Sequence, residues 1–130
     1  MSRERLLTER NVWMSPVRDD GRPHVAPIWF VYLDDRFWIG TGAGSVRVRN
    51  LSENPLASVA LEDGDRPVVA ECVVRIHETE RPPAGVDAFA EKFGWDIRRP
   101  EDVDVGRVVV LEATPRKWLF GIDLPTPASD

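Results

Sequence analysis

Strand-forming runs follow one another along this chain with only two helical stretches between them. The runs are rich in β-branched and aromatic residues and end at turn sequences such as Asp20-Gly21 and Asp34-Asp35. Strands that succeed each other without regular crossover helices pair antiparallel. The sequence therefore predicts a mainly β domain, a small closed barrel of six antiparallel strands. We expect these strands at residues 11–17, 24–33, 36–41, 56–61, 68–76 and 107–111, the last continuing to 117–122.

Two short helices complete the expected fold. The first begins at Ser45, a favourable N-cap residue, and ends before Pro55, because the residue preceding a proline disfavours helical geometry. The second occupies residues 86–93, where Val86, Phe89 and Phe93 recur at helical spacing. We expect this apolar face to pack on the sheet.

Composition limits the classes of function. The 130 residues suffice for one domain, which we assign to residues 1–130. A net charge of −5 argues against nucleic acid as the main partner, and no apolar run reaches the roughly 18 residues of a membrane span. The first ten residues lack a secretory signal, and the lone Cys72 cannot form an internal disulfide. These features predict a soluble cytoplasmic protein with Cys72 as a packed core thiol.

A glycine-rich turn is the strongest sign of a ligand. Residues 40–45, Gly-Thr-Gly-Ala-Gly-Ser, separate a predicted strand from the first helix, and Arg47 and Arg49 follow. Backbone amides in such a turn and the positive end of a helix dipole both suit a phosphate group. The pattern favours a phosphate-bearing cofactor, with a turn that merely links two strands as the alternative. A dinucleotide fingerprint fits less well, because its third glycine falls on Ser45 and the flanking segments are hairpins.

Three stretches together resemble the flavin-binding split-barrel family, which includes pyridoxamine 5′-phosphate oxidase and the deazaflavin (F420)-dependent reductases. They are DGRPHVAPIWF at residues 20–30, the strand and turn that end in Gly40-Thr41, and GSVRVRNLSENPLASV at residues 44–59. The resemblance implies a split β-barrel that binds FMN or coenzyme F420. It also implies a homodimer with two cofactor sites between the subunits, which would cover exposed aromatic residues such as Trp13, Trp38 and Trp95.

The resemblance also assigns residues to the cofactor. It places Ala26, Pro27, Ile28 and Trp29 beside the ring and ribityl chain, and Gly40, Thr41 and Ser45 near the phosphate. Arg47 would pair with the phosphate. Arg49 is the other basic candidate, with Asn50 beside it, although Arg47 and Arg49 point about 200° apart on a regular helix. Trp118, on the last strand, is the favoured pocket residue, against the alternative that the strand tryptophans are core or interface residues.

Departures from the oxidase branch indicate the type of reaction. Ala26 and Val46 stand where that branch would carry phosphate-binding arginines, and its C-terminal substrate segment is missing. The resemblance then favours a reductase that transfers a hydride between the bound cofactor and a small organic acceptor. The alternative is a non-catalytic protein that stores or senses flavin, F420 or haem. The cofactor supplies the redox chemistry, so no catalytic acid or base is assigned, and His24 and His77 are expected at the surface.

Overall fold

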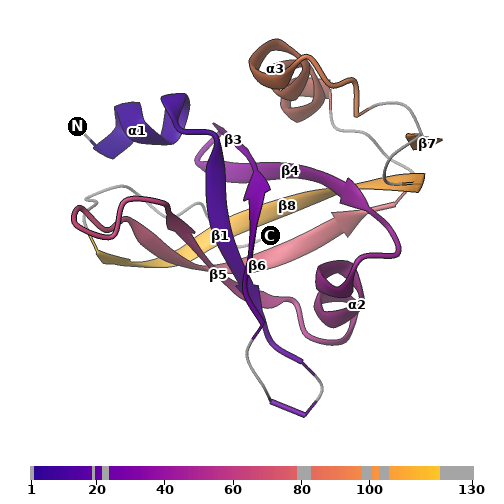
Figure 1. The fold of residues 1–130 in the computed structure, drawn as a ribbon, viewed down its shortest axis with the longest axis horizontal. Helices are drawn as coiled ribbons and strands as arrows, with labels where there is room; N and C mark the ends of the chain where they lie inside the picture. Colours follow the sequence, from indigo (N-terminus) through magenta and orange to yellow (C-terminus); the bar gives the residue numbers. More distant parts are fainter. Residues whose placement is uncertain are drawn as a thin grey trace.

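The computed structural model describes residues 2–18, 20–21, 24–78, 83–97, 101–102 and 106–120. Seven strands form a nearly closed antiparallel barrel in the order β2-β1-β5-β6-β8-β4-β3, and a two-residue strand, β7 (Glu101–Asp102), pairs with β8 (Figure 1). The other strands are β1 (Asn11–Pro16), β2 (Ala26–Trp29), β3 (Val31–Leu33), β4 (Arg36–Gly42), β5 (Leu56–Leu61), β6 (Val69–His77) and β8 (Gly106–Phe120). The helices are α1 (Ser2–Thr8), α2 (Val46–Glu53) and α3 (Pro83–Phe93).

The predicted antiparallel barrel is confirmed, with two differences in its elements. The single strand expected at residues 24–33 is divided into β2 and β3, so the barrel path has seven strands rather than six. A third helix, α1, precedes β1 and buries Leu6 completely in the barrel core. This helix has only seven residues and little amphipathic pattern, which explains why the sequence did not predict it.

The division between β2 and β3 falls at Phe30, where the chain changes partner. β2 pairs with β1, whereas β3 pairs with β4 through the tight turn at Asp34 and Asp35. The amide of Phe30 donates to the carbonyl of Arg10 at 3.1 Å, and its own carbonyl accepts from Nζ of Lys92 at 3.0 Å. The backbone groups of Phe30 are thus paired although it belongs to neither ladder, as buried backbone groups require.

The main core fills the barrel. Alternate residues of β1, β5 and β6 point inward, as the twofold periodicity of a strand requires. Completely buried members include Val12, Met14, Phe30, Ile39 and Leu111. Cys72 belongs to this core and is a free thiol, as predicted.

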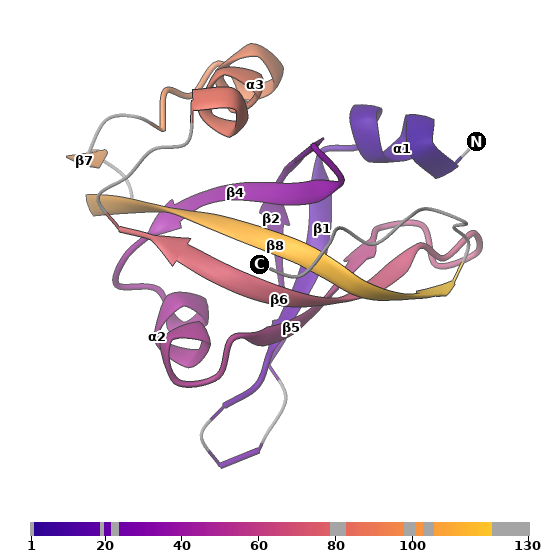
Figure 2. The same cartoon turned by 180° about the vertical axis from the view of Figure 1, so that it is seen from behind.

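A second apolar cluster lies outside the barrel, beneath α3. Val86 and Phe89 of this helix pack against Val31, Trp38 and Val110 from β3, β4 and β8. Figure 2 shows α3 over β4 and α2 on the other side of the sheet. Trp38 is therefore buried within its own subunit, which corrects the expectation that it needs cover from a second copy. The predicted packing of the second helix on the sheet is confirmed.

His77 is also covered, and the prediction that it is exposed is wrong. Only 7% of its surface is accessible, Nε2 lies 2.8 Å from Oε1 of Glu112, and its ring stacks on Trp38 with a centroid distance of 6.3 Å. The alternation of β6 places His77 on the outer face of the barrel, where the sequence alone suggests solvent. The side chains of neighbouring strands β4 and β8 cover that position.

The final strand, β8, continues through Pro115. A proline cannot donate a hydrogen bond to a ladder, and the pairing of β8 with β6 shifts register between Glu71 and Cys72, next to the Cys72–Pro115 pair. The expected continuation of the strand past this proline is confirmed as far as Phe120. Residues 121 and 122, which the prediction included, lie outside the described residues.

Close packing of α3 on Trp38 yields a stability prediction. A glycine-to-alanine change inside a helix ordinarily stabilises a protein by about 1 kcal/mol. A Cβ atom at Gly85, however, would lie 2.7 Å from Cδ2 of Trp38. We therefore expect Gly85→Ala to lower the free energy of unfolding by about 1–3 kcal/mol, measured by urea denaturation.

Gly64→Ala is the matched control, because a Cβ atom there would meet nothing within 4 Å. The control should change the free energy of unfolding by less than about 0.5 kcal/mol. Unchanged or increased stability of Gly85→Ala would contradict the packing described for α3.

Candidate functional site

The turn from β4 into α2 is held by backbone and side-chain hydrogen bonds. The amide of Ala43 donates to the carbonyl of Arg107 at 2.7 Å, and the amide of Ser45 donates to the carbonyl of Gly42 at 3.1 Å. Ser45 is the N-cap, as predicted, because its hydroxyl accepts from the amide of Val48 at 3.3 Å. These bonds hold the start of α2 at the end of β4.

The capped helix presents donors for an anion. The first intrahelical hydrogen bond runs from the amide of Arg49 to the carbonyl of Ser45. The amides of Val46 and Arg47 precede it and have no acceptor within the helix. Together with the positive end of the helix dipole, they suit an oxyanion such as phosphate.

Arg47 adds a full positive charge at the same place. Its Nη1 donates to Oγ1 of buried Thr41 at 3.1 Å, which ties the first turn of α2 to β4. Its Nε is buried without an acceptor. Partial burial of the guanidinium lowers the pKa of Arg47, although arginine remains a cation. A half-buried guanidinium with unused donors is complementary to a phosphate.

The other polar residues of α2 differ in their positions. Arg49 is exposed, as expected for a residue pointing away from Arg47 around the helix. Asn50 lies three residues after Arg47 and is 94% buried, with an accessible fraction of 6% and no partner for Nδ2. The structure therefore brings Thr41, Ser45 and Arg47 together and leaves Arg49 apart.

The predicted ring-binding segment occupies the neighbouring strand. β2 contacts β4. The chain then continues from β2 into β3, which pairs with β4. Pro27 and Trp29 face outward and are exposed, whereas Ile28 packs against the main core. The split between β2 and β4 therefore places Ala26–Trp29 next to the strand that carries Thr41.

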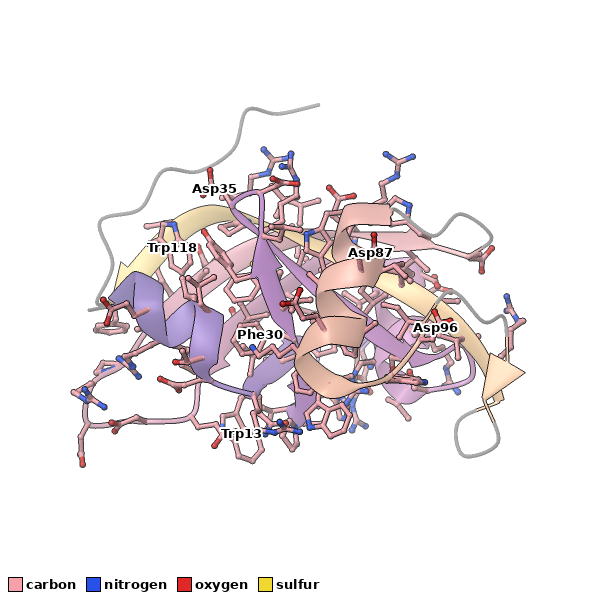
Figure 3. The ribbon with its side chains drawn as sticks, turned by 90° about the horizontal axis from the view of Figure 1, so that it is seen from above. Trp13, Phe30, Asp35, Asp87, Asp96 and Trp118 are labelled. Atoms are coloured by element: carbon pink, nitrogen blue, oxygen red, sulfur yellow. The ribbon has the colours of Figure 1, made fainter. Side chains whose placement is uncertain are left out.

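Gly40 and Trp118 take other places in the structure. The position of a side chain at Gly40 is filled by Ile97, whose Cγ2 would lie 2.6 Å from an added Cβ atom. Trp118 packs against Tyr32 and Phe37 near the end of β8. Thr41 pairs with Val109, nine residues earlier on that strand, so about 30 Å of strand separates them. Figure 3 shows Trp118 on the side of the molecule that carries α1.

A cavity of about 360 Å³ opens on the outer surface of β1, β5, β6 and β8, and no predicted site residue lines it. Burial raises the pKa of the Cys72 thiol, which borders this cavity, to about 12. A thiol that stays protonated is a poor nucleophile. The remaining lining residues are Ser15, Val17, Leu56, Ala57, Ser58, Glu71, Val73 and Arg116.

The acidic turn at residues 62–65 has a structural role. The carboxylate of Asp63 accepts from Arg66 at 3.0 Å and from the amide of Asp65 at 2.9 Å. The hydrogen bond from Arg66 lowers the pKa of Asp63. Among the described residues, no group of three His, Cys, Asp or Glu side chains is placed to hold a metal ion. Within the same residues, no helix has the length and apolar character needed to span a membrane.

A comparison with protein families establishes the family of this chain. The pyridoxamine 5′-phosphate oxidase family model matches residues 2–120, almost the whole chain. The chain belongs to this family. The predicted resemblance to flavin-binding split barrels is thus confirmed, and the family contains oxidoreductases. A search of curated proteins finds no match.

Solved structures with the same fold belong to proteins that are named for different functions. An F420 reductase shares 20% identity over 89% of this chain and 94% of its own, with a TM-score of 0.68. A conserved hypothetical protein from Mycobacterium tuberculosis shares 27% identity over 95% and 86%, with a TM-score of 0.66. The haem storage protein HutZ from Vibrio cholerae shares 18% over 92% and 91%, with a TM-score of 0.73. The fold is common to all three proteins.

The residues present fit the phosphate of a flavin-type cofactor. The donors at the start of α2 are two first-turn amides without helical acceptors and the guanidinium of Arg47, whose Nε has no partner among the described residues. Each is a donor, and no carboxylate among the described residues pairs with Arg47. An acceptor-rich dianion or phosphodiester is the complementary ligand.

Proposed function

We propose that this protein is an FMN- or F420-dependent oxidoreductase that transfers a hydride between the bound cofactor and a small organic acceptor. The observation that carries the proposal is the cluster of unused donors formed by Arg47 and the first turn of α2. Family membership supports a flavin-type ligand. The single free cysteine, buried in the core, agrees with the reducing environment of the cytoplasm, where we place the protein.

The cofactor, when bound, supplies the hydride chemistry on its ring. The chain's own residues bind and orient it. Arg47, with the amides of Val46 and Arg47, would hold the phosphate at the start of α2, and the strand β2 would run beside the ring and the ribityl chain. Thr41 fixes the guanidinium of Arg47 through a hydrogen bond and so limits the geometry in which a phosphate is bound. No side chain needs to act as an acid or base in this scheme.

We place the reaction in the reductase branch rather than with pyridoxamine phosphate oxidation. Val46 is exposed at the first helical position, and Ala26 begins β2, so neither position that holds an arginine in the oxidase branch has a charge here. Among the candidates described, Arg47 is then the charged group placed for the phosphate. A site with fewer cations leaves more of the binding to the amides and to contacts with the ring.

The first prediction concerns the cofactor and the turnover. The purified protein should carry a compound with a flavin or deazaflavin mass and spectrum. It should reduce quinones or enones with reduced F420, or with FMN and a nicotinamide reductant. We expect no pyridoxal phosphate from pyridoxamine phosphate and oxygen. A Soret band, or a bound flavin without turnover, would instead support the haem or storage alternative, and rapid pyridoxal phosphate formation would contradict the reductase assignment.

The second prediction concerns Arg47. Arg47→Ala should weaken binding of the cofactor by roughly 1.5–3 kcal/mol, because a charge-assisted hydrogen bond to phosphate is lost. Equilibrium dialysis with FMN and F420 measures the effect. Arg75→Ala is the control, because Arg75 is an exposed arginine on β6 opposite Glu112. Equal losses in both variants would remove Arg47 from the proposed role.

The third prediction concerns assembly. The resemblance implies a homodimer in which each flavin-type ring lies between the two subunits. Trp118 lies too far along β8 to reach the phosphate site of its own chain, so it can join such a site only from a partner subunit. We therefore expect a homodimer by sedimentation. A folded monomer at micromolar concentration that retains its cofactor would overturn this assembly.

A further inference from the structure

Arg10 is a cation held against an aromatic surface. It links α1 to β1, is exposed, and its guanidinium carbon lies 5.1 Å from the ring centroid of Trp29 and 4.9 Å from that of Phe93. Within the part of the chain that the structure describes, its side chain has no hydrogen-bond or ion-pair partner. Five N–H donors are therefore available to a ligand, and contact with two rings restricts their position.

The rings beside Arg10 are themselves held in place. Trp29 and Phe93 stack with their centroids 4.5 Å apart and an interplanar angle of 7°. Phe93 also packs against Phe89 of α3, at 4.8 Å. Lys92 anchors this end of α3, because Nζ donates to the carbonyls of Glu9 and Phe30. Trp29 and Phe93 thus form an aromatic wall that joins α3 to β2.

The local charge favours an anion. Burial, and then the charge of Arg10, lower the pKa of Lys92 to about 8, while Glu9 opposes the shift. The carboxylate of Glu9 is engaged with Arg5, at 2.7 Å. Two cations therefore share this surface of a chain whose net charge is −5, and the nearby carboxylate is paired elsewhere. A negatively charged ligand group would relieve their mutual repulsion.

An apolar surface extends from the cation along two strands. Trp13 on β1 lies directly opposite Pro27 on β2, and Trp29 lies opposite Asn11. Residues directly opposite each other in an antiparallel pair point to the same face. The exposed side chains of Trp29, Pro27 and Trp13 therefore form a row that starts next to Arg10. Figure 3 shows Trp13 at the edge of the molecule, outside the barrel.

We propose that Arg10 binds the carboxylate of a flat, conjugated molecule whose rings lie on the row Trp29, Pro27 and Trp13. This molecule would be the acceptor of the hydride. That part of the assignment rests on the function proposed above, in which β2 flanks the cofactor ring. Arg10 is then a specificity-determining residue that selects aromatic or conjugated carboxylates over neutral compounds of the same shape.

The experiment separates ligand recognition from cofactor binding. Calorimetric titration of the full-length protein with 2-naphthoate and with neutral 2-naphthamide measures the preference for the carboxylate. We expect about tenfold tighter binding of 2-naphthoate, lost in Arg10→Gln and retained in Arg75→Gln. The indole N–H signals of Trp13 and Trp29 should shift in the nuclear magnetic resonance spectrum on titration. Phe93→Leu, which removes one wall of the site, should weaken 2-naphthoate binding without changing the charge.

The amount of bound FMN or F420 is measured in the same samples by absorbance, and Arg10→Gln should leave it unchanged. A carboxylate preference that survives in Arg10→Gln, or no preference in the wild-type protein, would overturn the assignment of Arg10. An Arg10-dependent preference in a protein that binds neither cofactor would support the anion site and reject the proposed oxidoreductase function. Circular dichroism confirms that each variant is folded.

Discussion

The pairing of the backbone of Phe30 is the constraint on which the other features depend. A strand that leaves one neighbour for another must satisfy the peptide groups at the change, because they are removed from water. Here the carbonyl of Arg10 accepts from Phe30, and Lys92 donates to it. These two bonds allow β2 to turn toward β1 while β3 stays with β4. The sheet is open between its end strands, β2 and β3, and β2 lies beside β4 at this gap.

That gap positions the candidate site. α2 begins where β4 ends, so Arg47 and the first-turn amides lie at the end of the strand that β2 flanks. The hydrogen bond from Arg47 to Thr41 joins the helix to the strand, and the N-cap Ser45 sets where the helix starts. The phosphate-binding donors and the outward face of β2 are thus products of the same strand geometry. Lys92, which donates to the carbonyl of Phe30, also anchors the aromatic wall beside Arg10.

Much of the fold was predictable because its signals are local. Leu56–Leu61 is a strand of the predicted extent, Ser45 caps the predicted helix, and Asp34 and Asp35 form the expected turn. The errors concern contacts between distant segments. His77 alternates outward on β6, where Trp38 and Glu112 from other strands contact it. For the candidate site, helix geometry separated Arg49 from Arg47, whereas the role given to Arg47 came from the family resemblance. The role of Gly40 in admitting Ile97, and the wall around Arg10, depend on where α3 and its following loop dock, which no local pattern encodes.

The two apolar clusters share the strands β3, β4 and β8. The barrel interior and the layer beneath α3 lie on opposite faces of β3, β4 and β8, so the helix can detach while the barrel stays closed. Proteins often open in such cooperative units, with free energies below that of global unfolding. Amide hydrogens of α3 should then exchange faster than those of β4 and β8. Each opening would separate Lys92 from Phe30 and Phe93 from Trp29. Local unfolding of this one helix would therefore remove the aromatic surface and leave the start of α2 intact.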